Sequence, residues 1–155
     1  KPAYGIIASL PHLDDDSIYL NGDVFYDKEI LKMIVEDTRG SITAIQKTPW
    51  DEEQVNVILK EDSIIKLISK KISEDENHGE FIGVTKLTKD FIEKIKSTVE
   101  SLGKENFRYH FAVDLLNHVT NNTNIPIYAL DVTELKAIEI DTPEDYTEAK
   151  EKFNE

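Results

Sequence analysis

GEFIGVTKLTKDFIEKIKSTVESLG, residues 79–103, is the stretch that decides the fold class. Its first part, from Phe81 to Leu87, is rich in β-branched and other apolar residues and predicts a strand. Thr88 can then cap a helix that Gly103 closes. The apolar residues of this helix share one face; they are Phe91, Ile92, Ile95, Val99 and Leu102. A strand that runs directly into an amphipathic helix is typical of α/β proteins.

The same alternation continues on both sides of this stretch. Strands are predicted at 17–20, 41–46, 55–59, 64–68, 125–130 and 137–140. Helices are predicted after Asp27 as far as Glu36, at 111–119 and from Thr142 on. The pattern favours an α/β fold with a mixed, mostly parallel sheet flanked by helices, in which Lys60-Glu61-Asp62 turns a hairpin.

The start of the last helix carries the clearest local signal. Thr142 can cap the helix, Pro143 suits its first position, and Asp145 completes a capping box. A cap of this kind is worth about 1 kcal/mol. The chain has no internal repeat, linker or low-complexity tract, so residues 1–155 are expected to form a single domain.

Composition and charge exclude several classes of protein. The 155 residues carry 18 Lys and Arg against 31 Asp and Glu, which gives a net charge of −13 at pH 7, and no cysteine. An acidic chain without a basic cluster repels nucleic acid, and a chain without cysteine has neither disulfides nor thiolate metal sites. The longest apolar runs, such as 63–69, are far shorter than the roughly 20 residues of a membrane span. We therefore expect a cytoplasmic protein that binds neither nucleic acid nor membranes.

Two aspartates stand at the ends of predicted strands. Asp23 follows 17–20 through an Asn-Gly turn, and Asp141 follows 137–140. Ligands of open α/β sheets collect beyond strand ends, and Mg²⁺ prefers one or two carboxylates together with phosphate oxygens. The pair is a candidate magnesium site, although a turn and a helix start also explain the two positions without a metal.

Two further features could contact a ligand. Glu80 comes just before a strand and lies between Gly79 and Gly83, which would let a ligand approach closely. Trp50, the only tryptophan, could form a wall for a cationic ligand. A charged loop residue and a partly buried packing residue are the plainer explanations. The histidines show no metal-ligand spacing, and no GxSxG motif supports a nucleophilic serine.

Four motifs, taken in order, resemble the nucleotidyltransferase superfamily of sugar-phosphate and choline-phosphate type. They are Leu20-Asn21-Gly22-Asp23-Val24, Lys70 after 64–69, Gly79-Glu80-Phe81-Ile82-Gly83, and Glu139-Ile140-Asp141-Thr142-Pro143-Glu144-Asp145. The chain is most similar to phosphocholine and 2-aminoethylphosphonate cytidylyltransferases and to the nucleotidyltransferase domains fused to phosphoenolpyruvate mutase. The resemblance covers essentially the whole chain and implies a Rossmann-like nucleotide-diphospho-sugar transferase fold.

The resemblance also implies an activity. A nucleotidyl group, expected to be cytidylyl from CTP, would pass to a small phosphate or phosphonate acceptor such as phosphocholine, with Mg²⁺ as cofactor and pyrophosphate as product. By the family's pattern Asp23 and Asp141 would hold the metal, and Gly22 would lie beside it. Lys70, or its neighbour Lys71, would meet a phosphate oxygen.

The same pattern assigns the acceptor site. Glu80, next to Gly79, would face the head group of the acceptor, where a carboxylate suits an ammonium. Glu139 would support either the metal or the ammonium. Trp50 is not part of that pattern, and its expected role as an aromatic wall for the cation comes from the residue type alone. A phosphomonoester is largely dianionic at pH 7 and needs no general base, which agrees with the absence of a recognisable acid–base pair.

The chain departs from the family's pattern at its start. Family members begin with a strand and a basic, Gly-rich loop that cradles the triphosphate, and no such motif is present here. Lys1-Pro2-Ala3-Tyr4 instead resembles the entry to the helix that precedes the Asn-Gly-Asp strand in the family. The chain is therefore expected to be the C-terminal two-thirds of a nucleotidyltransferase domain, N-terminally truncated and inactive alone. Asn56, where relatives often carry Lys, is a smaller departure.

Two other functions stay open. A hexose-1-phosphate could replace the cationic acceptor, although Glu80, Glu139 and Trp50 favour a cation. The chain could also be a non-catalytic regulatory or interaction domain derived from such an enzyme, but the retained Asp23 and Asp141 argue against this. Whether the protein forms homo-oligomers is not decided by the sequence.

Overall fold

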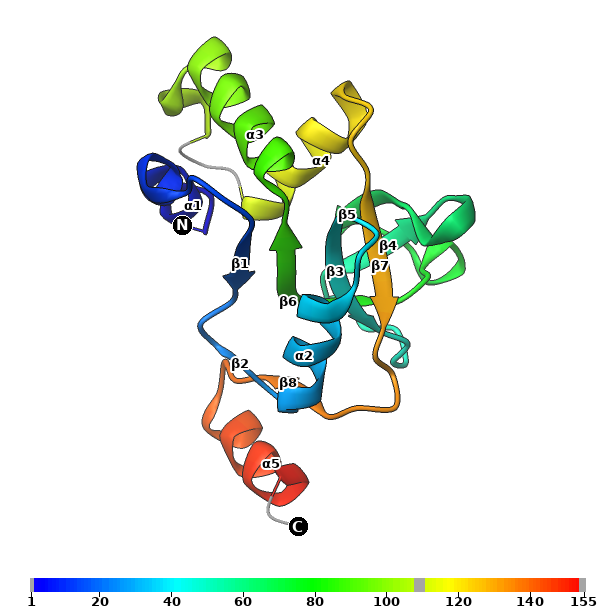
Figure 1. Ribbon diagram of the computed structural model, residues 1–155. Helices are drawn as coiled ribbons and strands as arrows, with labels where there is room; N and C mark the ends of the chain where they lie inside the picture. The colour runs from blue at the N-terminus through cyan, green and yellow to red at the C-terminus, as the bar shows by residue number, and fades with distance from the viewer. Residues whose placement is uncertain (1, 108–110, 154–155) are drawn as a thin grey trace.

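The computed structural model describes residues 2–107 and 111–153 (Figure 1). Its α-helices are α1 (Pro2–Ser9), α2 (Lys28–Glu36), α3 (Lys89–Leu102), α4 (Ala112–Asn122) and α5 (Pro143–Phe153). Its strands are β1 (Ser17–Leu20), β2 (Val24–Tyr26), β3 (Ser41–Gln46), β4 (Asn56–Leu59), β5 (Ile65–Ser69), β6 (Glu80–Leu87), β7 (Ile127–Asp131) and β8 (Ala137–Glu139). Every predicted strand is present. The predicted first helix is α1, and Lys1 lies outside the described residues.

Strand β6 is the centre of the main sheet, whose order is β5-β4-β6-β3-β7. One edge of β6 pairs with β3 along most of its length. The other edge is shared, because β1 pairs with 84–87 and β4 meets β6 only at Glu80, opposite Asn56. Gln46 of β3 lies opposite Glu80 on the first edge. The residue that begins β6 therefore lies where three strands meet.

The sheet is mixed, as predicted, but it is not mostly parallel. Among the described strands only β3 and β7 pair in parallel; the other pairings are antiparallel. The reason is the route of the chain. Parallel neighbours need a long crossover, whereas β5 follows β4 through the predicted hairpin and β6 follows β5 without an intervening α-helix. As a result β6 runs opposite to β1 and β3, which flank it.

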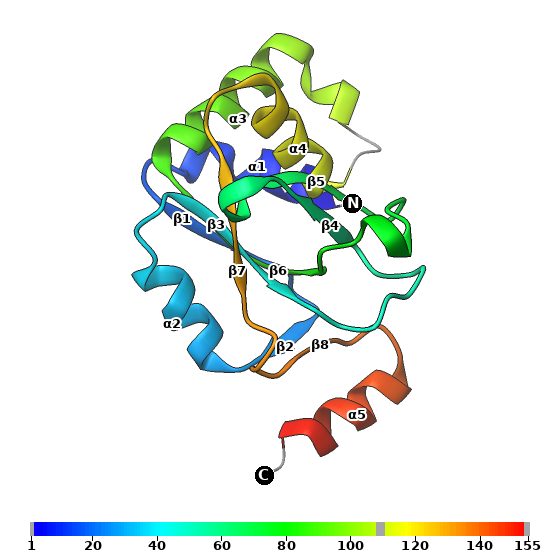
Figure 2. The ribbon, with the colours of Figure 1, turned by 90° about the vertical axis from the view of Figure 1, so that its right-hand side faces the viewer.

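Helices cover both faces of this sheet. Figure 2 shows α1, α3 and α4 on one side and α2 on the other. Ile45 and Phe81 of the central strands pack into the core on the first side. Ile42 and Ile82 pack into the core that contains α2. The side chains of successive strand residues thus pack into opposite layers, as an α/β sheet requires. No helix in the described part of the chain is long and apolar enough to cross a membrane.

The predicted helix caps are present. The side chains of Asp27 and Thr88 cap α2 and α3. At the start of α5, Asp145 N donates to Thr142 Oγ1 at 3.2 Å, and Thr142 N donates to Asp145 Oδ2 at 2.8 Å. This reciprocal pair is the capping box that the sequence predicts.

A second, two-stranded sheet lies outside the main one. Strand β2, which has no counterpart among the predicted strands, pairs antiparallel with β8 and places Val24 opposite Glu139. The pairing continues one step further, where Ile140 N donates to the carbonyl oxygen of Asp23 at 2.8 Å. Helix α5 follows β8 at the end of the molecule away from α3 (Figure 1). This small sheet joins an early and a late part of the chain.

Candidate active site

Three carboxylates gather where the β2–β8 ladder ends. One carboxylate oxygen from each of Asp23, Glu139 and Asp141 lies within 4.8 Å of the others, and all three side chains are exposed. The predicted closeness of Asp23 and Asp141 is therefore observed, while their role as metal ligands stays a prediction. The ladder explains the closeness, because Asp23 precedes β2 and Asp141 follows β8 on the antiparallel partner.

The cap of α5 fixes the backbone at Asp141. The amides of Asp141 and Thr142 both donate to Asp145 Oδ2, at 3.0 and 2.8 Å. The hydrogen bond from the Thr142 amide, with contributions from the Thr142 hydroxyl and the Asp141 amide, lowers the pKa of Asp145. The carboxylate of Asp145 thus caps the helix, and the carboxylate of Asp141 is the one that belongs to the cluster.

Negative charge accumulates in this acidic cluster of Asp23, Glu139 and Asp141. Partial loss of water raises the pKa of Glu139, and the carboxylates of Asp141, Asp23 and Glu80 raise it further. Lys70 acts in the opposite direction. Carboxylates that repel one another in this way are stabilised by a hard cation, so the chemistry of the cluster fits Mg²⁺.

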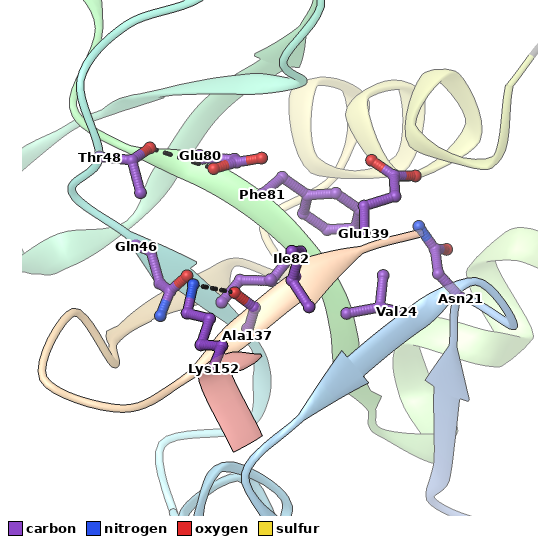
Figure 3. Close-up of a pocket in the computed structure, with 11 residues that line it drawn as sticks. Asn21, Val24, Gln46, Thr48, Glu80, Phe81, Ile82, Ala137, Glu139 and Lys152 are labelled. Atoms are coloured by element: carbon purple, nitrogen blue, oxygen red, sulfur yellow. Dashed lines mark hydrogen bonds between the residues drawn. The ribbon is translucent and has the colours of Figure 1, made fainter. Parts of the chain in front are cut away.

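A pocket of about 260 Å³ adjoins the cluster and shares Glu139 with it. Figure 3 shows Glu139 and Asn21 on one side of this pocket, with Gln46 and Lys152 on the other. The volume suits a small ligand. The polar side chains of the lining, which give such a ligand its hydrogen-bond partners, are Asn21, Gln46, Thr48, Glu80, Glu139 and Lys152.

Glu80 is half-buried in the pocket wall, at the start of β6. Its Oε2 accepts hydrogen bonds from Thr48 Oγ1 at 3.0 Å and from Gln54 Nε2 at 3.3 Å. Burial raises the pKa of Glu80; the bond from Thr48 and the charge of Lys152 offset part of this rise, and Asp51 adds to it. Glu80 is therefore a fixed and partly desolvated acceptor for a ligand.

The NGD and GEFIG motifs are in direct contact. Gly83 has a φ of +72°, and the side chain of Asn21 occupies the space that a Cβ of Gly83 would need. Asn21 N also donates to the Gly83 carbonyl oxygen at 2.9 Å. Gly79 has a φ of +150°, and its Cβ would lie 3.0 Å from the carbonyl oxygen of Gln46. Gly83 thus lets the Asn21 side chain pack against β6, and Gly79 lets the backbone before Glu80 pass close to Gln46.

Other predicted site residues lie outside the pocket lining. Trp50 is 37% exposed, and its indole donates to the Ile72 carbonyl oxygen at 3.2 Å. Lys70 is exposed, with its Nζ 3.5 Å from Glu53 Oε2, but its charge is close enough to lower the pKa of Glu139. The structure thus brings Lys70 near the cluster and gives Trp50 a structural partner.

Three polar residues of the pocket lining are not identified from the sequence, namely Gln46, Thr48 and Lys152. Gln46 offers a readable signal, because it is a long polar residue that directly follows Ala44 and Ile45 at the end of a predicted strand. Nothing in the sequence points to Thr48 or Lys152, which reach the pocket only through tertiary packing. Conversely, the predicted Gly22 and Lys71 are exposed and do not line it.

Comparisons with known proteins give a match in structure only. Neither a family model nor a curated protein matches the sequence. The chain is similar to the inositol-1-phosphate CTP transferase from T. maritima, with a TM-score of 0.68 and 22% identity over 92% of this chain and 56% of that one. It is similar to the CTP:phosphocholine cytidylyltransferase from Streptococcus pneumoniae, with a TM-score of 0.71 and 18% identity over 97% of this chain and 63% of that one. It is also similar to a protein described as a putative glucose-1-phosphate thymidylyltransferase from Bacillus anthracis, with a TM-score of 0.75 and 14% identity over 97% of this chain and 60% of that one.

These likenesses establish the fold. The chain has the mixed α/β fold of nucleotidyltransferases, and the resemblance seen in its motifs is confirmed at that level. The chain spans between 56% and 63% of the length of these three proteins. Its activity and its ligands are matters for proposal.

Proposed function

We propose that this chain is part of a nucleotidyltransferase that passes a nucleotidyl group from an NTP to a small phosphorylated acceptor and releases pyrophosphate. The observation that carries the proposal is the position of the acidic cluster beside the polar pocket, with Glu139 belonging to both. A cation site next to a small polar pocket, on a fold shared with nucleotidyltransferases, supports a reaction between two phosphate-bearing substrates.

The acidic cluster would hold a magnesium ion. Asp23 and Asp141 are the ligands expected from the sequence, and Glu139 lies close enough to be a third. Burial raises the pKa of Glu139, and the neighbouring carboxylates raise it further; a cation would relieve this repulsion between the carboxylates. Mg²⁺ bound there supplies charge neutralisation for the reacting phosphate groups.

The remaining residues position the acceptor. Glu80 faces its head group from the pocket wall, and Lys70 contributes positive charge near the cluster for a phosphate oxygen. The acceptor phosphate is already dianionic at pH 7, so no side chain has to remove a proton. The protein's contribution is orientation and electrostatic stabilisation, as in other phosphoryl-type transfers.

Cytidylyl transfer from CTP is the form of the reaction that we propose. Two of the similar proteins carry CTP in their names. The acceptors in the three names are inositol-1-phosphate, phosphocholine and glucose-1-phosphate, so both a cationic and a hydroxyl-bearing head group are compatible with the fold. A hexose-1-phosphate acceptor is therefore the second candidate.

Metal binding tests the proposal without depending on turnover. The probe is Mn²⁺, titrated into the chain and followed by water-proton relaxation. Asp23→Asn and Asp141→Asn should each weaken Mn²⁺ binding by at least about tenfold, because each removes a charged ligand. The matched control is Glu100→Gln, which removes one negative charge from an exposed position on α3 and should leave the affinity unchanged.

The outcome that contradicts the metal site is equally definite. If Asp23→Asn binds Mn²⁺ as well as Glu100→Gln does, general attraction by an acidic chain explains the binding. The cluster would then have no ligand role, and the proposed reaction would lose its main support.

A further inference from the structure

The pocket beside the acidic cluster, in which we place the acceptor, also contains a positively charged group, the ammonium of Lys152. This lysine lies near the end of α5, is half-buried, and donates from Nζ to the carbonyl oxygen of Ala137 at 2.9 Å. Within the described part of the chain it is the one pocket-lining side chain with a positive charge. Figure 3 shows it beside Gln46, on the other side of the pocket from Glu139.

Lys152 changes the charge balance at one end of the pocket. An acceptor whose phosphate lies at the acidic cluster, on the Glu139 side, would point its head group toward the other side. There it meets the carboxylate of Glu80, the ammonium of Lys152 and the neutral side chains of Thr48 and Gln46. The Lys152 charge is near enough to lower the pKa of Glu80. This head-group end, taken as Glu80, Lys152, Thr48 and Gln46, has no net charge.

We propose that Lys152 is a specificity-determining residue that favours acceptors with a hydroxyl-bearing head group over acceptors with a permanent positive charge. The inference rests on the function proposed above and names the acceptor class. An ammonium has three N–H donors, of which one is used by Ala137, so Lys152 can donate to a hydroxyl oxygen while Glu80 accepts the hydroxyl proton. A quaternary ammonium has no proton for Glu80 and is repelled by Lys152.

This arrangement reverses the preference expected from Glu80 alone. A pocket with an uncompensated carboxylate selects a cation. The sequence, in which only the side chains of Glu80, Glu139 and Trp50 are assigned to the acceptor site, predicts a pocket of this kind. With Lys152 at the same head-group end as Glu80, a cationic head group there would approach one like charge for each unlike charge. A polyol or sugar phosphate satisfies both groups by hydrogen bonds.

The test compares two acceptors that share a phosphate and differ in the head group. Myo-inositol 1-phosphate and choline phosphate are titrated into the chain in the presence of Mg²⁺ and followed by NMR chemical shifts. Lys152→Met should weaken binding of the inositol phosphate by about ten- to a hundredfold, the usual effect of losing a charged hydrogen bond. It should strengthen binding of choline phosphate by about three- to tenfold, because the repulsion is gone.

Lys150→Met is the matched control. It removes the same charge from the same helix, but Lys150 is exposed and lies over the ring of Tyr146, 5.1 Å from its centroid. It should change neither affinity. Because Lys152 also anchors α5 to Ala137, Lys152→Gln is the second variant: it keeps an N–H donor and loses the charge, and it should show the same gain for choline phosphate.

The outcomes separate the two levels of the argument. If the wild-type chain binds neither acceptor with Mg²⁺ present, the proposed function fails and the inference falls with it. If wild type binds an acceptor but Lys152→Met and Lys152→Gln shift both affinities equally, or not at all, the inference alone is overturned. An equal effect of Lys150→Met likewise overturns it, since general charge would then be the cause.

Discussion

Glu80 and Asp145 show, at the scale of single residues, how surroundings decide what a carboxylate does. Glu80 is half-buried, and burial raises its pKa despite the hydrogen bond from Thr48. Asp145 lies at the start of a helix, and the amide of Thr142 lowers its pKa. The two side chains therefore contribute to the pH dependence of folding stability with opposite signs.

Glu80→Gln tests the first of these responses. Folding raises the pKa of Glu80, so the stability linked to its proton is fully present below the unfolded pKa of about 4.3 and is lost as pH rises through the folded pKa. Glu80→Gln removes that loss. We expect the variant to be more stable than wild type at pH 7, with the advantage shrinking as the pH falls to about 4.

Urea unfolding at both pH values measures this effect. Glu100→Gln serves as the control for removing one negative charge from an acidic chain, and its effect is subtracted. An advantage of Glu80→Gln that is as large at pH 4 as at pH 7 would show that burial of the charged form is not its cause.

Which site residues can be predicted depends on how local their role is. Asp23 and Asp141 flank strand ends, a property that is visible in the pattern of apolar residues, and they do lie together. Lys152 lines the pocket only because α5 packs beside β8, and no local pattern encodes that contact. The hydrogen bond from Trp50 to the carbonyl group of Ile72 is equally non-local, and the predicted contact of Trp50 with a cation stays a prediction.

At the scale of elements, the same distinction separates what the sequence predicts from what it does not. Each helix cap joins residues within three positions of one another, so Thr88 and Thr142 are readable as caps. Strand β2 has three residues and is paired with β8, far along the chain, which explains why no local signal reveals it. The direction of neighbouring strands depends on the route of the whole chain and is equally non-local. The prediction of a mostly parallel sheet was wrong for that reason.

The capping box of α5 gives a prediction at this scale. Thr142→Ala removes the oxygen that accepts from Asp145 N and should cost about 1 kcal/mol of helix stability. Because the same turn holds the backbone of Asp141, we expect faster amide exchange at the start of α5 and severalfold weaker Mn²⁺ binding. Hydrogen exchange and the Mn²⁺ titration measure the two effects.

Thr147→Ala is the matched control in the same helix. The Thr147 hydroxyl donates to the Pro143 carbonyl oxygen at 3.0 Å and caps nothing. If Thr147→Ala weakens Mn²⁺ binding as much as Thr142→Ala does, the link between the capping box and the acidic cluster is wrong.

At the scale of the whole molecule, the net charge of −13 makes the folded chain repel itself. Raising NaCl from about 10 to about 150 mM shortens the Debye length from about 30 to about 8 Å. We therefore expect the melting temperature to rise over this range. Mg²⁺ at matched ionic strength should raise it further by binding the folded state alone. Asp23→Asn should lose this further rise, and an undiminished rise would point to general screening.

Because the β2–β8 ladder joins an early and a late part of the polypeptide, the acidic cluster exists only when both parts are in place. Closing so long a loop carries an entropy cost, and a ladder of three residues per strand offsets little of it. We therefore expect the cluster to open more readily than the core beneath α1, α3 and α4. A cation held between Asp23 and Asp141 would act as a reversible cross-link across that loop, so that occupancy of the site reports on the integrity of the folded chain.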